Sequence, residues 1–154
     1  MKSAEGTFKK LYAIRFEPGE DVMESLQSFC EAHDLKNGVI VSDIGSLEGC
    51  SFFDPSEIPG KPGLYEYGAP IEKPSPIELI SMGGIICTDA EGKPSLHIHA
   101  SFADEAGNGF AGHFKAGNRV LTTVELVVAE IEGIAMTRAI DPLRGVPCFT
   151  PVQL

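Results

Sequence analysis

The sequence has no tryptophan and few basic residues. Its 12 lysines and arginines are outnumbered by 22 aspartates and glutamates, which leaves a formal net charge of −10 at pH 7. A surface of this charge repels a phosphate backbone, so composition alone argues against direct DNA binding. The only adjacent basic pair, Lys9-Lys10, is more typical of a solvated strand end than of a nucleic-acid patch.

Long hydrophobic runs are also missing. The longest apolar stretch, Leu79–Cys87, contains Ser81 and two glycines and is too short to cross a bilayer. The first residues, Met1–Gly6, lead into no hydrophobic stretch, so no signal peptide is predicted. We therefore expect no association with a membrane.

The four cysteines show neither a close pairing nor a metal-binding spacing. Cys30 falls on the apolar stripe of a predicted helix and Cys87 lies in an apolar run, which predicts buried free thiols. Cys50 and Cys148 are isolated in the sequence. Free thiols are typical of a reducing compartment, so we expect a cytoplasmic protein.

Motifs for nucleophilic catalysis and phosphate binding are missing as well. The sequence has no Gly-x-Ser-x-Gly elbow and no phosphate-binding glycine loop. Gly45-Ser46 predicts a bend or bulge in a strand, and Gly83-Gly84 predicts a kink or a close backbone approach. Any chemistry must therefore come from other residues.

Three of the four histidines lie in a predicted β-hairpin whose strands are Leu96–Phe102 and Gly109–Phe114. His97 and His99 are two residues apart, so on a strand both imidazoles leave the same face. His113 lies on the second strand. Whether its imidazole joins the other two depends on the register of the hairpin.

The apolar pattern of the two strands predicts this register. Burying their apolar faces together requires Phe102 opposite Phe110, and this places His99 opposite His113. A shift of one residue would turn the phenylalanines of the second strand to the wrong face. The hydrophobic pattern therefore gathers three imidazoles on one patch.

Three neutral imidazoles on a rigid hairpin suit Zn²⁺ or another divalent metal, with a fourth position left for water, substrate or a carboxylate. We predict His97, His99 and His113 as the metal ligands. The alternative is that they are polar-face histidines of a half-exposed sheet. His33, near a helix C-terminus, is more typical of a dipole partner or a core-edge residue.

The rest of the chain predicts one helix among strands. The helix Val22–Leu35 begins after Asp21 as N-cap, with Glu24 completing a capping-box pattern, and stops at Lys36-Asn37-Gly38. Its predicted buried stripe is Val22, Leu26, Phe29, Cys30 and His33. Strands are predicted over residues 7–16, 39–54, 77–88, 96–102, 109–114, 119–132 and 134–140, where 77–88 is either one long strand or a pair of strands.

These elements predict an α+β fold in which the one main amphipathic helix packs on a mostly antiparallel sheet of about seven strands. No repeat or linker divides the chain, so we expect a single domain over residues 1–154. Its core covers about 8–141. A proline-rich surface excursion occupies 55–76, with a candidate short strand at Leu64–Tyr67, and a tail follows over 142–154.

Six segments resemble motifs of the PPC domain, the plants-and-prokaryotes conserved domain, in that family's order and over nearly the whole chain. They are residues 16–22 before the helix, the Gly-Ser-Leu turn at 44–47, the strand at 78–84, the histidine stretch at 96–104, Gly112–Phe114 and the late strand at 122–127. The resemblance implies an antiparallel sheet with a packed helix, assembled as a homotrimer. It also implies a metal bound by the residues matching His97, His99 and His113.

Plant members of the family carry AT-hooks, and the DNA-binding label often given to bacterial members derives from those hooks. An AT-hook needs an Arg-Gly-Arg-Pro core for the narrow minor groove. The nearest segment is Arg144-Gly145-Val146-Pro147, which lacks the second arginine and basic flanks. We interpret it as a turn in the tail.

Three functions follow as hypotheses. The first is a metal-binding scaffold or a module that binds a small molecule or partner at the three-histidine site. The second is a metal-dependent hydrolase or lyase, with Glu78, Asp104 or Glu125 as base and Arg119 or Arg138 holding an anionic substrate. These residues also have structural interpretations. Asp104 is typical of a turn, Glu125 of a solvent-exposed strand face, and Arg138 of an ion pair with Asp141. The third is a nucleic-acid-associated regulator.

Overall fold

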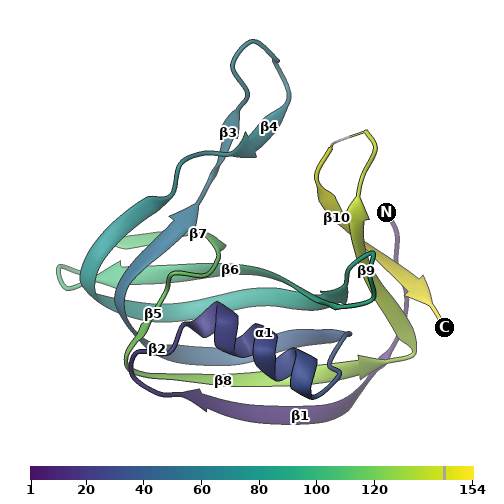
Figure 1. Ribbon diagram of the computed structural model, residues 1–154, viewed down its shortest axis with the longest axis horizontal. Helices are drawn as coiled ribbons and strands as arrows, with labels where there is room; N and C mark the ends of the chain where they lie inside the picture. The colour runs from purple at the N-terminus through teal and green to yellow at the C-terminus, as the bar shows by residue number, and fades with distance from the viewer. Residues whose placement is uncertain (144) are drawn as a thin grey trace.

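The computed structural model describes residues 1–143 and 145–154, so Arg144, the first residue of the predicted tail turn, lies outside it. The described residues form ten strands and one helix (Figure 1). In chain order these elements are β1 Thr7–Phe16, α1 Val22–Ala32, β2 Gly38–Phe53, β3 Pro55–Glu57, β4 Tyr65–Tyr67, β5 Ile71–Thr88, β6 Pro94–Asp104, β7 Gly109–Phe114, β8 Val120–Glu132, β9 Ile134–Ile140 and β10 Pro147–Gln153.

Eight of the strands form one large sheet in the order β1-β8-β2-β7-β6-β5-β9-β10, and β3 pairs with β4 in a separate ladder. All pairings are antiparallel except a parallel contact between β5 and β9 at Thr88 and Thr137. The α+β class with a mostly antiparallel sheet is therefore confirmed. The strand count exceeds the seven predicted because β3 and β10 were not predicted and β4 was predicted only as a candidate short strand at Leu64–Tyr67.

Strand β2 closes part of this sheet on itself. It pairs with β5 along one edge and with β8 along the other, and at Phe52 and Phe53 the second edge passes to β7. Since β5 also pairs with β6 and β6 with β7, these four strands form a closed ring of hydrogen-bonded neighbours. Aromatic rings from them fill the core, with Phe52 lying 5.7 Å from both Phe102 and Phe110. Because β6 and β7 are part of this closed ring, neighbouring strands hold the histidine hairpin in place on both sides.

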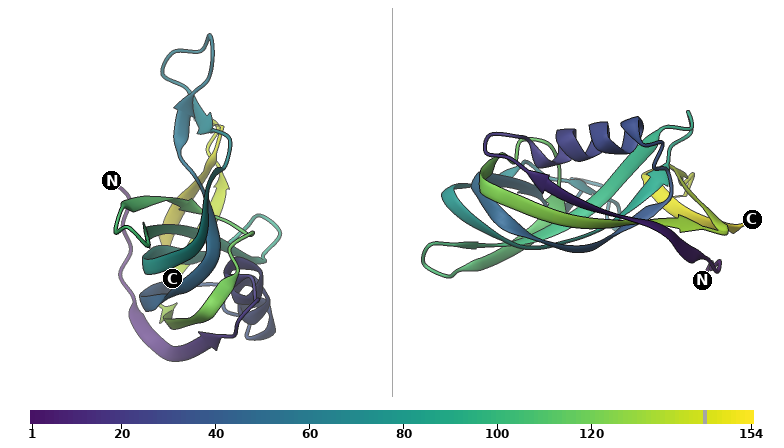
Figure 2. Two further views of the ribbon diagram at one scale, coloured as in Figure 1. Left: turned by 90° about the vertical axis from the view of Figure 1, so that its left-hand side faces the viewer. Right: turned by 90° about the horizontal axis from the view of Figure 1, so that it is seen from below.

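Helix α1 covers one face of the sheet, as the second view in Figure 2 shows most clearly. Asp21 caps it by accepting hydrogen bonds from the backbone N–H groups of Met23 and Glu24. Three residues of the predicted stripe, Val22, Leu26 and Cys30, are buried, and a fourth, Phe29, is half-buried and packs against the core. Burying this apolar stripe is what docks the helix.

The predicted end of the helix at Leu35 is wrong. The last helical residue is Ala32, because His33 leaves helical geometry and Asp34 takes a φ of +51°. His33 therefore lies outside the buried stripe, and its exposed imidazole contacts Phe29 with ring centres 4.3 Å apart and an angle of 35° between the rings. This matches the prediction of a residue at the edge of the core.

Two segments rich in proline contain more strand than expected. β5 begins at Ile71, inside the predicted excursion, because residues 71–74 pair with the end of β2. What remains is an arm, residues 54–70, whose β3–β4 hairpin projects from the body (Figures 1 and 2). In the tail, β10 pairs with β9 although it contains Pro147 and Pro151. It is the outermost strand of its sheet, where a missing N–H is tolerated.

The helix that the structure describes has neither the length nor the apolar character required to span a bilayer.

Candidate metal centre

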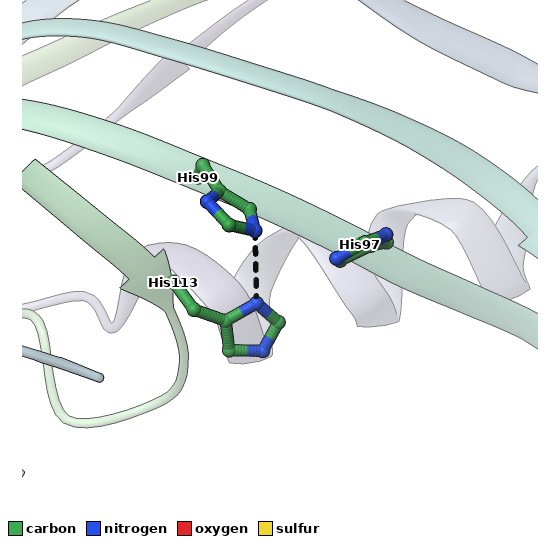
Figure 3. A group of neighbouring side chains, drawn as sticks. All are labelled: His97, His99 and His113. Atoms are coloured by element: carbon green, nitrogen blue, oxygen red, sulfur yellow. Dashed lines mark hydrogen bonds between the residues drawn. The ribbon is translucent and has the colours of Figure 1, made fainter. Parts of the chain in front are cut away.

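The predicted register of the histidine hairpin is confirmed. Phe102 pairs with Phe110, Ile98 with Phe114, and His99 with His113. The phenylalanines and Ile98 face the core, so the three histidines leave the opposite face of β6 and β7 (Figure 3). The hydrophobic pattern of the sequence is therefore what brings the imidazoles together.

The three imidazoles form one compact group. Each offers a ring nitrogen, and these three atoms all lie within 4.8 Å of one another. The ring centres are 5.2–5.4 Å apart, and Nδ1 of His113 lies 3.4 Å from Nε2 of His99 (Figure 3). Nitrogens this close can share one ion after small rotations of the rings, because zinc–nitrogen bonds are about 2.0–2.1 Å long.

The surroundings of the group keep two of its imidazoles, those of His97 and His113, neutral near pH 7. Burial lowers the pKa of His97 to about 4, with further lowering by the charges of Arg138 and His99. Burial likewise lowers the pKa of His113 to about 4, and the neighbouring cations act in the same direction. A neutral imidazole has a free lone pair, which is the form that binds a metal.

Tyr67 and Lys115 also belong to this site, and the sequence analysis missed both. Tyr67, on the arm, stacks on His113 with ring centres 4.4 Å apart and an angle of 21° between the rings. The ammonium of Lys115 lies 4.8 Å from the ring centre of Phe53 and 5.3 Å from that of Tyr67. Only the fold brings the arm back over β7. The available sequence signal was the position of Lys115, two residues after His113.

Two adjacent glycines on β5 adapt the sheet to this site. A Cβ on Gly84 would lie 2.6 Å from the carbonyl oxygen of His97 and 2.8 Å from a side-chain carbon of Ile98. The predicted close backbone approach is therefore present at this position. A Cβ on Gly83 would meet nothing within 4 Å, because Gly83 faces open space beside His99.

Two concave regions adjoin the group. A hollow of about 510 Å³ opens beside His99, and small side chains leave it room. Its lining includes Asp54, Ser81, Gly83, Ser101 and Ala111. A second groove, of about 660 Å³, lies between α1 and the end of β7, where Phe53 and Lys115 form part of the wall. A ligand of a few atoms has room beside His99, whereas no histidine of the group lines the second groove.

The carboxylates proposed as bases are not part of the compact ligand group. Asp104 accepts hydrogen bonds from the N–H groups of Ala106 and Asn108, so it orders the hairpin loop. Glu78 and Glu125 are exposed on the faces of β5 and β8. Among the residues that the structure describes, the only group of three or more candidate metal ligands is the histidine triad.

The two candidate arginines differ in position. Arg119 donates to the carbonyl oxygen of Gly19, at the loop before α1. Arg138 lies on β9 and its Nη1 donates to the carbonyl oxygen of Leu96, the residue beside His97. Of the two, Arg138 is therefore the one beside the candidate metal centre.

The cysteines behave as the sequence predicted. All four are free thiols, and Cys30, Cys50 and Cys87 are buried. Burial raises the pKa of Cys30 to about 12 and that of Cys50 and Cys87 to about 11. Protonated thiols in the core are packing residues rather than ligands.

Comparison with known families agrees with the fold. Residues 3–132 match the family model of the Plants and Prokaryotes Conserved (PCC) domain. The chain belongs to this family. PPC is the other abbreviation of its name, so the resemblance carried by the sequence motifs is confirmed.

Two curated proteins that match this PCC domain are much longer than it. Two bifunctional proteins GlmU from Synechococcus strains are 26% and 27% identical to it over 136 residues. The matches cover 88% of this chain but only 20% and 19% of those proteins. The chain therefore spans about a fifth of the length of the curated relatives it matches.

Solved structures share the fold over nearly the whole chain. A metal-containing protein from Archaeoglobus fulgidus is 24% identical with a TM-score of 0.81, over 97% of this chain and 99% of that one. A plant- and prokaryote-conserved protein from Pyrococcus horikoshii is 23% identical with a TM-score of 0.78, over 100% of both chains. A candidate DNA-binding protein from Ralstonia eutropha is 21% identical with a TM-score of 0.74, over 97% and 93%. At these identities the likeness shows the fold.

Proposed function

We propose that this PCC domain binds one divalent metal ion through His97, His99 and His113 and acts as a metal-binding scaffold or a module for a small ligand. The observation that carries the proposal is the convergence of three ring nitrogens within 4.8 Å on one rigid hairpin. The name of the Archaeoglobus relative, a metal-containing protein, supports it.

The chemistry of the donors favours zinc. Three imidazoles on facing strands match a tetrahedral ion with one position open, whereas magnesium and calcium prefer oxygen ligands. When bound, such an ion polarises a ligand at its open position and lowers the pKa of a bound water. The chain itself supplies the positions of the ligands and, through Tyr67, a cover over His113.

Metal content measured by plasma mass spectrometry tests the proposal, on protein purified without chelator. We expect about one metal per chain in the wild type and its loss in His99→Ala. His33→Ala is the matched control, because it removes the fourth histidine, which is exposed and contacts Phe29 away from the triad. A wild type that stays free of metal after incubation with Zn²⁺ contradicts the proposal.

We also propose that the domain assembles as a homotrimer, as the family resemblance implies. The outer face of the sheet presents large apolar side chains, and an exposed apolar patch is typical of a protein interface. Val41, Ile44 and Ile80 are each about half exposed on the adjacent strands β2 and β5. Light scattering after size exclusion should give three times the chain mass of 16.4 kDa. A mass equal to one chain contradicts the trimer.

A metal-dependent hydrolase or lyase is the second candidate function. The hollow beside His99 favours it, since a substrate could reach the open position of the metal there. Asp54 lines this hollow, and it would be the carboxylate to test as a base. Turnover that requires both the metal and Asp54, followed with a panel of ester and phosphoester substrates, would establish an enzyme.

A nucleic-acid role has weaker support. The Ralstonia relative carries a DNA-binding name, but a net charge of −10 disfavours unaided contact with a phosphate backbone. Binding to DNA at low salt with a steep salt dependence would revive it. The buried free thiols suit a reducing compartment, so we propose a cytoplasmic location.

A further inference from the structure

The three-histidine group provides no negative charge to balance a divalent ion. Among the described residues, no cysteine, aspartate or glutamate joins the three imidazoles within the 4.8 Å that groups them. A divalent cation held only by neutral ligands keeps its full charge in a partly buried place, which is costly unless an anion accompanies it. The fourth ligand is the natural place for that anion.

Arg138 lies on the same face of the sheet as the histidines. His97 pairs with Ile85 on β5, and further along β5 Thr88 pairs with Thr137 on β9. Because side chains alternate along a strand, Ile85 and Arg138 both leave the face opposite to that of the two threonines. The guanidinium is thus directed to the side of the sheet from which His97 projects.

The guanidinium of Arg138 has unused hydrogen-bonding capacity at this place. Its Nη1 donates to the carbonyl oxygen of Leu96 over 3.3 Å, next to His97. Its Nε is buried and has no hydrogen-bond partner among the described residues. Guanidinium nitrogens carry five N–H donors in a planar fork that matches an oxyanion, and a buried unpaired donor costs free energy.

Lys115 supplies a second cation on the other side of the group. It follows His113 by two residues, and its ammonium lies over the rings of Phe53 and Tyr67, the latter stacked on His113. The protein has a net charge of −10, whereas two positively charged side chains lie near the three imidazoles. The local charge is therefore opposite in sign to the net charge.

One acidic side chain lines each of the two concave regions. Asp54 lines the hollow beside His99, and Glu24 lines the groove that contains Lys115. Both are exposed, and neither belongs to the group of metal ligands. They limit the size of an anion that can enter, because a long anionic ligand would approach their carboxylates.

We propose that the metal centre takes a small oxyanion, a carboxylate or a phosphate, as its fourth ligand and that Arg138 holds the anion by hydrogen bonds, with Lys115 adding favourable charge. The inference rests on the proposed metal site. It adds the chemical class of the ligand and the residue that recognises it. Arg138 acts here as a binding residue, whether or not the domain catalyses a reaction.

Titration of the Co²⁺-loaded protein tests this inference, because the visible absorption of cobalt changes when its fourth ligand changes. The probes are sodium acetate and inorganic phosphate, at constant ionic strength, with chloride as the reference salt. In Arg138→Gln we expect the dissociation constant of the anion to rise at least about tenfold, because the variant loses a charge-assisted hydrogen bond to the anion. In Lys115→Gln we expect a smaller rise of about two- to fivefold.

Arg15→Gln is the matched control for the loss of one positive charge. Arg15 is exposed on β1, where it pairs with Glu17. Its replacement by glutamine should leave the affinity for the anion unchanged. Arg138→Lys, which keeps the charge but not the planar fork, should bind the anion with intermediate affinity. This variant also serves if Arg138→Gln does not fold, as judged by circular dichroism.

The outcomes separate the two proposals. A wild type that does not bind Co²⁺ or Zn²⁺ removes the metal site and this inference with it. A wild type that binds Co²⁺ but shows no response to acetate or phosphate overturns the inference alone, and so does an equal anion affinity in wild type and Arg138→Gln. A response to acetate only, or to phosphate only, supports the inference and identifies which oxyanion the site accepts.

Discussion

Replacing Asp43 by asparagine should make the free energy of unfolding less dependent on pH. In the described chain the ladder between β2 and β5 stops at the Val39–Ile85 pair and resumes at Gly45–Leu79. Asp43 lies in this gap, is 7% exposed, and its Oδ1 accepts a 2.6 Å hydrogen bond from the N–H of Met82. Its carboxylate thus serves as a substitute partner for a backbone donor.

Burial raises the pKa of Asp43 from its ordinary value of 3.8 to about 6, although the Met82 N–H acts in the opposite direction. The unfolded chain therefore loses this proton near pH 3.8 and the folded chain near pH 6. Between these values the folded state binds more protons, so the free energy of unfolding falls as the pH rises. At about 1.4 kcal/mol for each tenfold change in proton affinity, the loss is up to about 3 kcal/mol.

Asparagine keeps an oxygen for the Met82 N–H but carries no charge at any pH. Relative to wild type, Asp43→Asn should therefore gain up to about 3 kcal/mol in unfolding free energy between about pH 3.5 and pH 7.5. Any cost of burying the new NH₂ group is the same at both pH values and cancels in this difference. Urea denaturation at each pH, at one protein concentration, measures it.

Asp34→Asn is the matched control. The Asp34 side chain is 80% exposed beside Lys36, and its φ of +51° is one that asparagine tolerates. Because this carboxyl group is exposed, the substitution Asp34→Asn should have a small effect on the free energy of unfolding at both pH values. If Asp43→Asn and wild type differ by the same amount at both pH values, within about 0.5 kcal/mol, the burial of a charge at this position is refuted.

The remaining predictions concern the support of the metal centre. Gly84→Ala should lower the free energy of unfolding by about 1–3 kcal/mol in urea denaturation, because its Cβ would lie 2.6 Å from the His97 carbonyl oxygen. Gly83→Ala, one residue away in open space, should change it by less than about 0.5 kcal/mol, and equal effects would contradict the close approach. Tyr67→Ala should weaken Zn²⁺ binding by up to about tenfold, measured by competition with a chromophoric chelator, because it uncovers His113. Tyr65→Ala, an exposed tyrosine of the same arm, should leave the affinity unchanged, and so an equal loss in both variants would assign the effect to the arm as a whole.

The local sequence pattern determined the hairpin and hence the histidine group. Alternation along β6 and β7 leaves one register that buries Ile98, Phe102 and the facing phenylalanines together, and His99 then has to face His113. The start of the helix at Asp21 followed from local capping chemistry in the same way. These features depend on neighbours within a few residues or across one short turn, so the sequence carries them directly.

Only the tertiary structure decided what surrounds the histidines. Tyr67, Lys115 and Arg138 reach the group from the arm, from the end of β7 and from β9, and no periodicity in the sequence relates these three segments. The same holds for Asp43, whose buried place depends on a gap in the β2–β5 ladder and on the N–H of Met82, 39 residues away in the chain. Pairing between distant strands is set by the packing of the whole core, and for that reason the histidine group could be predicted from the sequence while the charges around it could not.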